Sequence, residues 1–125
     1  HINEFLTALE SFSGLCICTT NRRDGMDPAA MRRFSFKIPF GYAGAKQLHA
    51  LYASLLAPLA GTPLPAALKT KLGMQKKLTP GDFHAVRMQF WLNDPGSVTH
   101  DILLAALLHE QAIKLDRVAQ RIGFA

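Results

Sequence analysis

The sequence is poor in cysteine, with Cys16 and Cys18 as the only two among 125 residues. They lie two residues apart in an apolar run, so their side chains would share one side of an extended backbone. This spacing does not form the Cys-x-x-Cys loop of a redox site. We interpret them as reduced thiols buried in the core, which is the usual state of cysteine in the cytoplasm.

The sequence also lacks a long hydrophobic run. Its longest apolar stretch, Ile102 to Leu108, is far shorter than the roughly 20 residues that a membrane-spanning helix needs. No signal peptide is recognisable at the N-terminus. We therefore expect a cytoplasmic protein with no membrane partner.

The common catalytic motifs are absent as well. Neither the phosphate-binding loop G-x-x-x-x-G-K-[ST] nor the dinucleotide fingerprint G-x-G-x-x-G occurs. His109 and Glu110 begin like a zinc-protease motif, but Ile113 stands where the second histidine ligand is required. No serine lies in a nucleophile elbow. We expect no metal site in this sequence.

What remains is the composition of an ordinary folded protein. Hydrophobic residues make up 49% and charged residues 18% of the chain, which is too apolar for intrinsic disorder. The length fits one domain or a part of a larger one. The net charge of +5 admits an anionic partner but does not require nucleic acid.

The first 40 residues combine short helices with two expected strands. Residues 2–11 carry apolar side chains at helical spacing. Residues 15–20 (LCICTT) form an apolar run typical of a buried strand, and residues 34–40 (FSFKIPF) alternate like a half-buried one. Between them, Asp27 caps a short helix that has Pro28 at its first position.

After Gly41 the pattern becomes helical throughout. Helices are expected over residues 43–57 and 65–72, with a loop rich in proline and glycine over 57–65, and a last helix over 99–122. Another helix starts after Thr79, because Pro80 takes the first helical position and Asp82 sits where a capping box needs its acceptor. The four helices predict a separate domain over residues 41–125.

The stretch from Gly14 to Phe40 closely resembles the second region of homology of AAA ATPases. In that family an apolar strand ends in a Thr-Asn pair called sensor 1, which matches Thr20 and Asn21. A segment of the type Asp-Pro-Ala then supplies the arginine fingers, which matches DPAAMRRF with Arg32 and Arg33. The family often has two residues between its arginines and this chain has none, so the resemblance leaves open which of the two is the finger.

The resemblance extends over nearly the whole chain. The first helix is similar to the one that follows the Walker B strand, and LTPGDF is similar to the start of the sensor 2 helix in the helical lid. It implies that Gly81 and Asp82 lie near the nucleotide, with Arg87 as a substitute for the missing sensor 2 arginine. Residues 1–40 would then be the end of an α/β nucleotide domain of the P-loop type, and residues 41–125 a four-helix lid.

The function implied by the resemblance is ATP hydrolysis that drives the remodelling of a macromolecule. The resemblance implies that the parent protein binds ATP and Mg2+, acts on a protein substrate and assembles as a homo-oligomeric ring, a hexamer. The chain itself lacks the phosphate-binding loop, so we expect it to bind no cofactor and to be inactive alone. Its two strands would also lack the strand that lies between them, and we expect self-association through residues 15–19 or 34–40, or a different pairing.

Two other functions stay open. Four lysines could make a basic helical module that binds nucleic acid, although a solvated surface is the more ordinary explanation; they are Lys69, Lys71, Lys76 and Lys77. The second alternative is a protein-interaction module without any link to ATP. Arg22 and Arg23 are interpreted as solvated turn residues.

Overall fold

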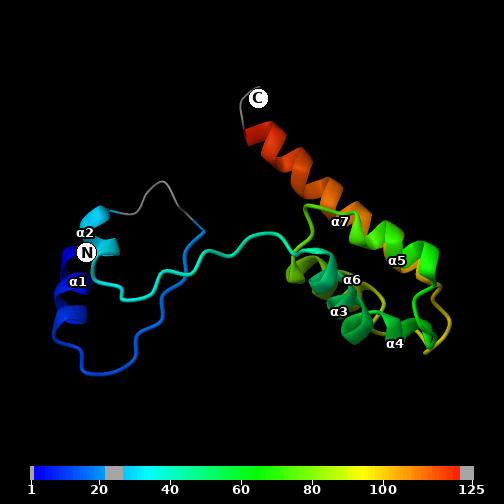
Figure 1. The fold of residues 1–125 in the computed structure, drawn as a ribbon, viewed down its shortest axis with the longest axis horizontal. Coiled ribbons are helices and arrows are strands. Elements are labelled where there is room, and N and C mark those ends of the chain that lie inside the picture. The colour runs from blue at the N-terminus through cyan, green and yellow to red at the C-terminus, as the bar shows by residue number, and fades with distance from the viewer. Residues whose placement is uncertain (1, 22–26, 122–125) are drawn as a thin grey trace. The chain divides into compact units, whose positions relative to one another are not determined.

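The structure is a computed structural model that describes residues 2–21 and 27–121. All regular secondary structure within these ranges is helical, in seven helices. The prediction of a mainly helical chain is therefore confirmed. The chain divides into two compact units, His1–Phe40 and Gly41–Ala125, which are described separately below (Figure 1).

The first unit contains the helices α1 (Ile2–Glu10) and α2 (Pro28–Met31). In α1 the apolar residues recur at helical spacing, and Leu6 is buried. The predicted cap of α2 is confirmed, because an Asp27 carboxylate oxygen accepts a hydrogen bond from the Ala29 amide at 3.0 Å. Pro28 occupies the first helical turn, where its missing N–H group costs no hydrogen bond.

The two expected strands are wrong for the described residues. Residues 15–20 and 34–40 form no ladder and no helix, and their apolar side chains face solvent: Ile17 is 79% and Phe36 is 85% exposed. Both segments are rich in apolar residues, which is typical of strands. A strand forms, however, only when a neighbouring strand accepts and donates its backbone hydrogen bonds. No strand lies beside either segment in the described part of the chain.

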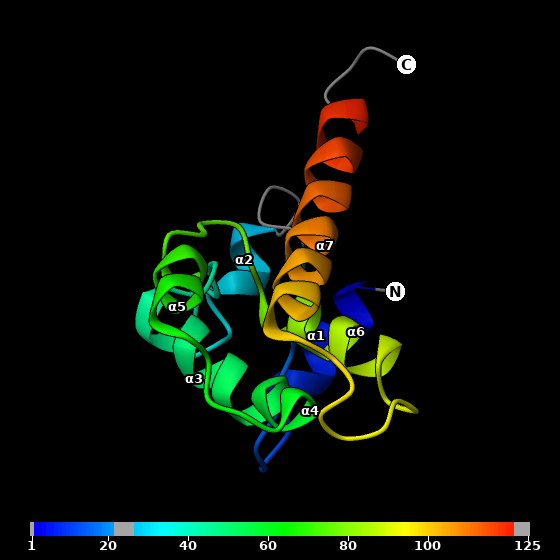
Figure 2. The same ribbon diagram turned by 90° about the vertical axis from the view of Figure 1, so that its right-hand side faces the viewer.

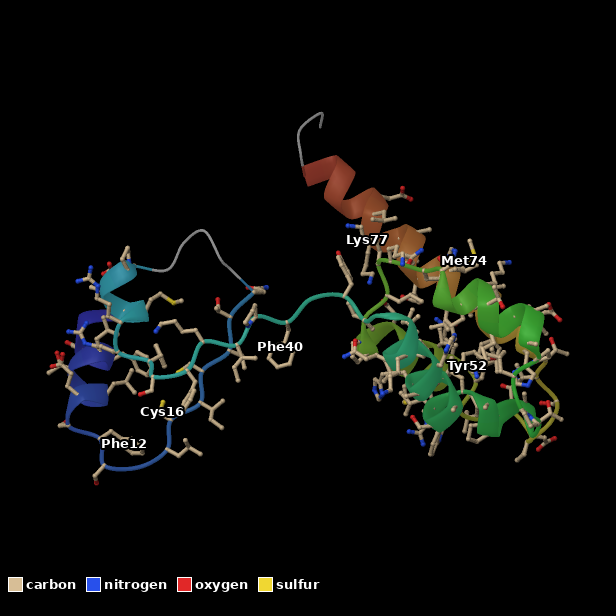
Figure 3. The ribbon with its side chains drawn as sticks, in the orientation of Figure 1. Phe12, Cys16, Phe40, Tyr52, Met74 and Lys77 are labelled. Atoms are coloured by element: carbon tan, nitrogen blue, oxygen red, sulfur yellow. The ribbon has the colours of Figure 1, made fainter. Side chains whose placement is uncertain are left out.

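The expectation that the two thiols are buried is wrong for the same reason. Cys16 and Cys18 are both free and exposed. They lie on the irregular segment after α1, where Figure 3 labels Phe12 and Cys16. Their sulfur atoms lie 3.7 Å apart. The hydrogen bond between the two thiols raises the pKa of Cys18 above its ordinary value of 9.0.

The second unit is a helical domain. Its helices are α3 (Ala45–Leu55), α4 (Ala57–Ala60), α5 (Ala66–Gly73), α6 (Pro80–Gln89) and α7 (His100–Arg121). The four long helices lie where the sequence predicts them, and the short α4 is an addition inside the expected loop. Helix α6 packs mainly against α7, while α3 contacts α4, α5 and α6. Figures 1 and 2 both show the C-terminal half of α7 extending beyond the other helices of this unit.

The core of this unit joins all five helices. Its largest fully buried side chains are Tyr52, Phe83, Leu48, Leu56, Leu72, Leu78, Leu103, Leu104, Leu107 and Val86. The leucines of α3 and its C-terminal end form part of this core, because Leu48 and Leu56 are fully buried and Leu51 and Leu55 pack against the same cluster. Figure 3 shows Tyr52 in the middle of the helices.

The turn after α4 requires glycine. Gly61 ends the helix with φ at +73°, in the left-handed region that a residue with a Cβ rarely adopts. The turn at residues 93–96 lies beside it: Gly96 has φ at +82°, and its amide donates to the Leu59 carbonyl at 3.0 Å. This hydrogen bond holds α4 against the connection between α6 and α7.

No helix within the described ranges combines the length and the hydropathy that a bilayer crossing needs.

Candidate functional site

The arginine pair lies at the C-terminal end of α2. The Arg32 amide donates to the Pro28 carbonyl at 3.2 Å, and the Arg33 amide donates to the Ala30 carbonyl at 3.2 Å. The capped, proline-started turn therefore fixes the backbone from which both guanidinium groups project. Sequence reasoning singled out this pair, and the structure puts both side chains at one helix end.

The two arginines differ in their contacts. Arg33 donates from Nε to the Glu10 carboxylate at 2.8 Å and lies 2.7 Å from the same oxygen through Nη2. Its Nη1 donates to the Ala29 carbonyl at 3.1 Å. Arg32 is exposed, and within the described residues its guanidinium has neither a hydrogen bond nor an ion pair. Only one of the two cations is thus compensated by a carboxylate.

Thr20 and Asn21 lie at the end of the exposed segment that was expected to be a strand. Both are exposed, and Asn21 directly precedes residues outside the described ranges. Within those ranges no hydrogen bond links Asn21 to Arg32 or Arg33. The sensor 1 prediction places Thr20 and Asn21 at the end of a strand. Within the described residues no strand precedes them. Arg22 and Arg23 lie outside the described residues.

Gly81 and Asp82 belong to the first turn of α6. Asp82 is only 6% exposed, and one of its carboxylate oxygens accepts from the Thr79 amide at 2.8 Å and from the Thr79 hydroxyl at 3.1 Å. The same oxygen accepts from the Lys114 ammonium at 2.6 Å. Asp82 therefore accepts from the N-cap residue of its own helix, as the predicted capping box requires. Its bond with Lys114 also ties α6 to α7. Gly81 is exposed, and a Cβ there would meet only the Thr79 hydroxyl at 3.7 Å.

Sequence reasoning missed the partners of Asp82. Lys114 also donates to the Lys77 carbonyl at 2.7 Å, and its ammonium lies 5.5 Å from the centre of the Tyr42 ring. The Lys77 ammonium lies 5.0 Å from the same ring. The Lys114–Asp82 ion pair spans 32 positions, and the cation–π contacts of Lys77 and Lys114 with Tyr42 span 35 and 72, so no local spacing could have indicated them.

Arg87 lies on a different side of α6 from Gly81. Their positions differ by six residues, which places them about 120° apart around a helix of 3.6 residues per turn. The Arg87 guanidinium lies 5.6 Å from the centre of the Trp91 ring. Both border a hollow of about 180 Å3, whose full lining is Ser54, Leu55, Pro58, Leu59, Arg87, Trp91, Asn93 and Pro95.

The described residues contain no cluster of three or more potential metal-binding side chains of histidine, cysteine, aspartate or glutamate. Comparison with protein-family models, with curated proteins and with solved structures finds no match to this chain.

Proposed function

We propose that this chain is the C-terminal part of an AAA ATPase module that hydrolyses ATP to remodel a macromolecule. Residues 1–40 would be the end of its nucleotide domain, and residues 41–125 its helical lid. The phosphate-binding loop and the carboxylates for Mg2+ are not among the 125 residues. The proposal therefore assigns them to another part of the same ATPase, and the chain alone would not turn over ATP.

The observation that carries the proposal is the arginine pair at the end of α2, in the order Thr-Asn, Asp-Pro-Ala, Arg-Arg-Phe. The transferred phosphoryl group gathers negative charge on its oxygens, and a guanidinium can neutralise that charge through two parallel hydrogen bonds. A guanidinium at an exposed helix end is free to reach the ATP of a neighbouring subunit. This requirement favours a homo-oligomeric ring, and a hexamer is the assembly we propose.

Three further features support the proposal. The observed cap at Asp27 and Pro28 gives the arginine segment the short helix that its sequence predicts. The second unit is helical, and α6 starts at the expected Thr79–Asp82 cap. Two exposed, reduced thiols are compatible with the cytoplasm, where we place the protein. A protein substrate is the partner that remodelling by such a ring implies.

The test is ATP turnover by a polypeptide that joins the phosphate-binding part of the ATPase to this chain. Asn21→Ala should lower maximal turnover more than nucleotide affinity, because a sensor side chain orients the attacking water or the terminal phosphate. Lys46→Ala is the matched control, since Lys46 is exposed on α3 in the other unit. Loss of affinity at unchanged maximal turnover would contradict the sensor assignment.

A further inference from the structure

The two neighbouring arginines have unequal freedom. All three side-chain nitrogens of Arg33 are engaged, with Glu10 and with the Ala29 carbonyl, and its side chain is only 32% exposed. Arg32, one residue earlier, is exposed and has no side-chain partner in the described ranges. A guanidinium that already binds a carboxylate must give up that bond before it can take a phosphate oxygen.

We propose that Arg32 is the phosphate-contacting finger and that Arg33 is a positioning residue, held by Glu10. This division of roles rests on the proposed ATPase function. It resolves the choice that the motif leaves open, because the uncompensated cation is the one that can add positive charge at a neighbouring active site. Arg32 also keeps its full set of donors for a bidentate contact.

Arg33 is well placed to orient its neighbour. Glu10 is the last residue of α1, and Ala29 lies inside α2, so one side chain ties the ends of both helices together. The Arg33 amide and the Phe34 amide also bond back to Ala30 and Met31, which continues the turn past the helix. Loss of the Glu10 bond would free this turn and let Arg32 point in several directions.

The first experiment measures ATP turnover by the polypeptide that contains the phosphate-binding part and this chain. Arg32→Ala should lower turnover by about three to five orders of magnitude. Arg32→Lys should not restore it, because an ammonium lacks the planar fork. Glu10→Gln and Arg33→Ala should each lower turnover by roughly ten- to a hundredfold, as expected for a misplaced catalytic group.

The decisive variant exchanges the two charges. Glu10→Arg combined with Arg33→Glu rebuilds the ion pair in reverse and should recover most of the turnover lost in either single variant. If Arg33 were the finger, a carboxylate in its place would leave turnover at or below that of Arg33→Ala, and the proposal would be overturned. Full turnover by Arg32→Ala would overturn it as well.

A second experiment separates this inference from the proposed function. In the 15N-labelled chain, Glu10→Gln should shift the Nε–H resonance of Arg33 and leave that of Arg32 in place. An equal response of both arginines, or none, would overturn the assignment of the ion pair whatever the turnover. Absence of turnover in the unmodified polypeptide, with the Arg33 resonance shifted as expected, would refute the ATPase function and the finger role while the pairing stands.

Discussion

Tyr52 is the most deeply enclosed polar side chain of the second unit. Its hydroxyl lies 2.9 Å from Nδ1 of His100, and Nε2 of His100 lies 3.0 Å from the Thr62 carbonyl. A carbonyl can only accept, so Nε2 carries the hydrogen and Nδ1 accepts from the tyrosine. Burial raises the pKa of Tyr52 to about 12, and the Asp101 carboxylate adds to the increase.

The first prediction concerns alkaline pH. The pKa of Tyr52 in the folded chain is higher than its ordinary value of 10.0, so the neutral phenol stabilises the fold fully below pH 10. That contribution is lost as the pH rises from 10 to about 12, and it amounts to about 2–3 kcal/mol at most. Urea unfolding of the wild type and of Tyr52→Phe across this range checks it. Tyr42→Phe is the control on an exposed ring, and an equal alkaline loss in Tyr52→Phe would contradict the prediction.

The second prediction concerns the Asp82 carboxylate. Asp82→Asn leaves the Lys114 ammonium without its counter-charge and weakens the cap of α6, so the free energy of unfolding should fall by about 1–3 kcal/mol. Asp116→Asn is the matched control, because Asp116 is exposed on α7. Urea midpoints of the two variants give the comparison. A midpoint for Asp82→Asn equal to that of the control would show that the capping oxygen contributes nothing.

At this scale the sequence predicted what is local. The Thr79–Asp82 cap and the Asp27 cap could be read from spacings of two or three residues, since a cap joins near neighbours. The ion pair of Arg33 with Glu10 spans 23 residues, and that of Asp82 with Lys114 spans 32. Contacts of that range depend on how helices pack, which no periodicity in the chain reveals.

At the scale of elements, helices were predicted better than strands. A helix satisfies its own backbone, so α3, α5, α6 and α7 appear where their apolar spacing and caps indicate. A strand depends on a neighbour, and no strand lies beside segments 15–20 and 34–40 in the described part of the chain. The same dependence explains why Thr20 and Asn21 were found in sequence, yet the strand expected to carry them is absent.

The third prediction follows from those two segments. Leu15, Ile17, Phe36, Ile38 and Phe40 are all exposed large apolar side chains. Their burial is favourable by roughly 25 cal/mol per Å2, and the unpaired backbone beside them can add strands from another copy. Sedimentation should therefore show association that grows with concentration.

A double variant provides the test of where the copies meet. Ile17→Lys with Ile38→Lys should reduce the association, because lysine on an edge segment opposes pairing. Leu92→Lys is the control, since Leu92 is equally apolar and highly exposed but lies in the second unit. Association unchanged by the double variant, or a strictly monomeric wild type at high concentration, would contradict the prediction.

At the scale of the whole molecule, the two units differ in how they are stabilised. Every member of the main core cluster lies between Ala43 and Leu107, inside the second unit. The first unit has far fewer buried side chains in its described residues, with Leu6 and Ala30 as its buried apolar residues there. A domain folds alone when its own core is sufficient, and we expect this of the second unit, which holds the main core cluster.

The fourth prediction is that residues 41–125 fold without the first unit. The fragment should show a cooperative thermal transition, followed by circular dichroism, with a midpoint within a few degrees of that of the second unit in the whole chain. Its first residues matter, because the Ala43 amide donates to the Leu78 carbonyl at 3.1 Å, and the ammonium groups of Lys77 and Lys114 lie 5.0 Å and 5.5 Å from the centre of the Tyr42 ring. These contacts attach the start of the unit to the segment that precedes α6 and to α7.

A fragment of residues 44–125 is the matched comparison. It keeps Gly44, whose nitrogen donates to the Gln47 side chain at the start of α3, but it loses Tyr42 and Ala43. The loss of one backbone hydrogen bond and two cation–π contacts should cost about 1–2 kcal/mol, which lowers the midpoint on the order of 5–10 °C in a domain of this size. Equal midpoints for the two fragments would show that residues 42 and 43 do not stabilise the unit. A 41–125 fragment without a cooperative transition would show instead that the helical unit depends on residues 1–40.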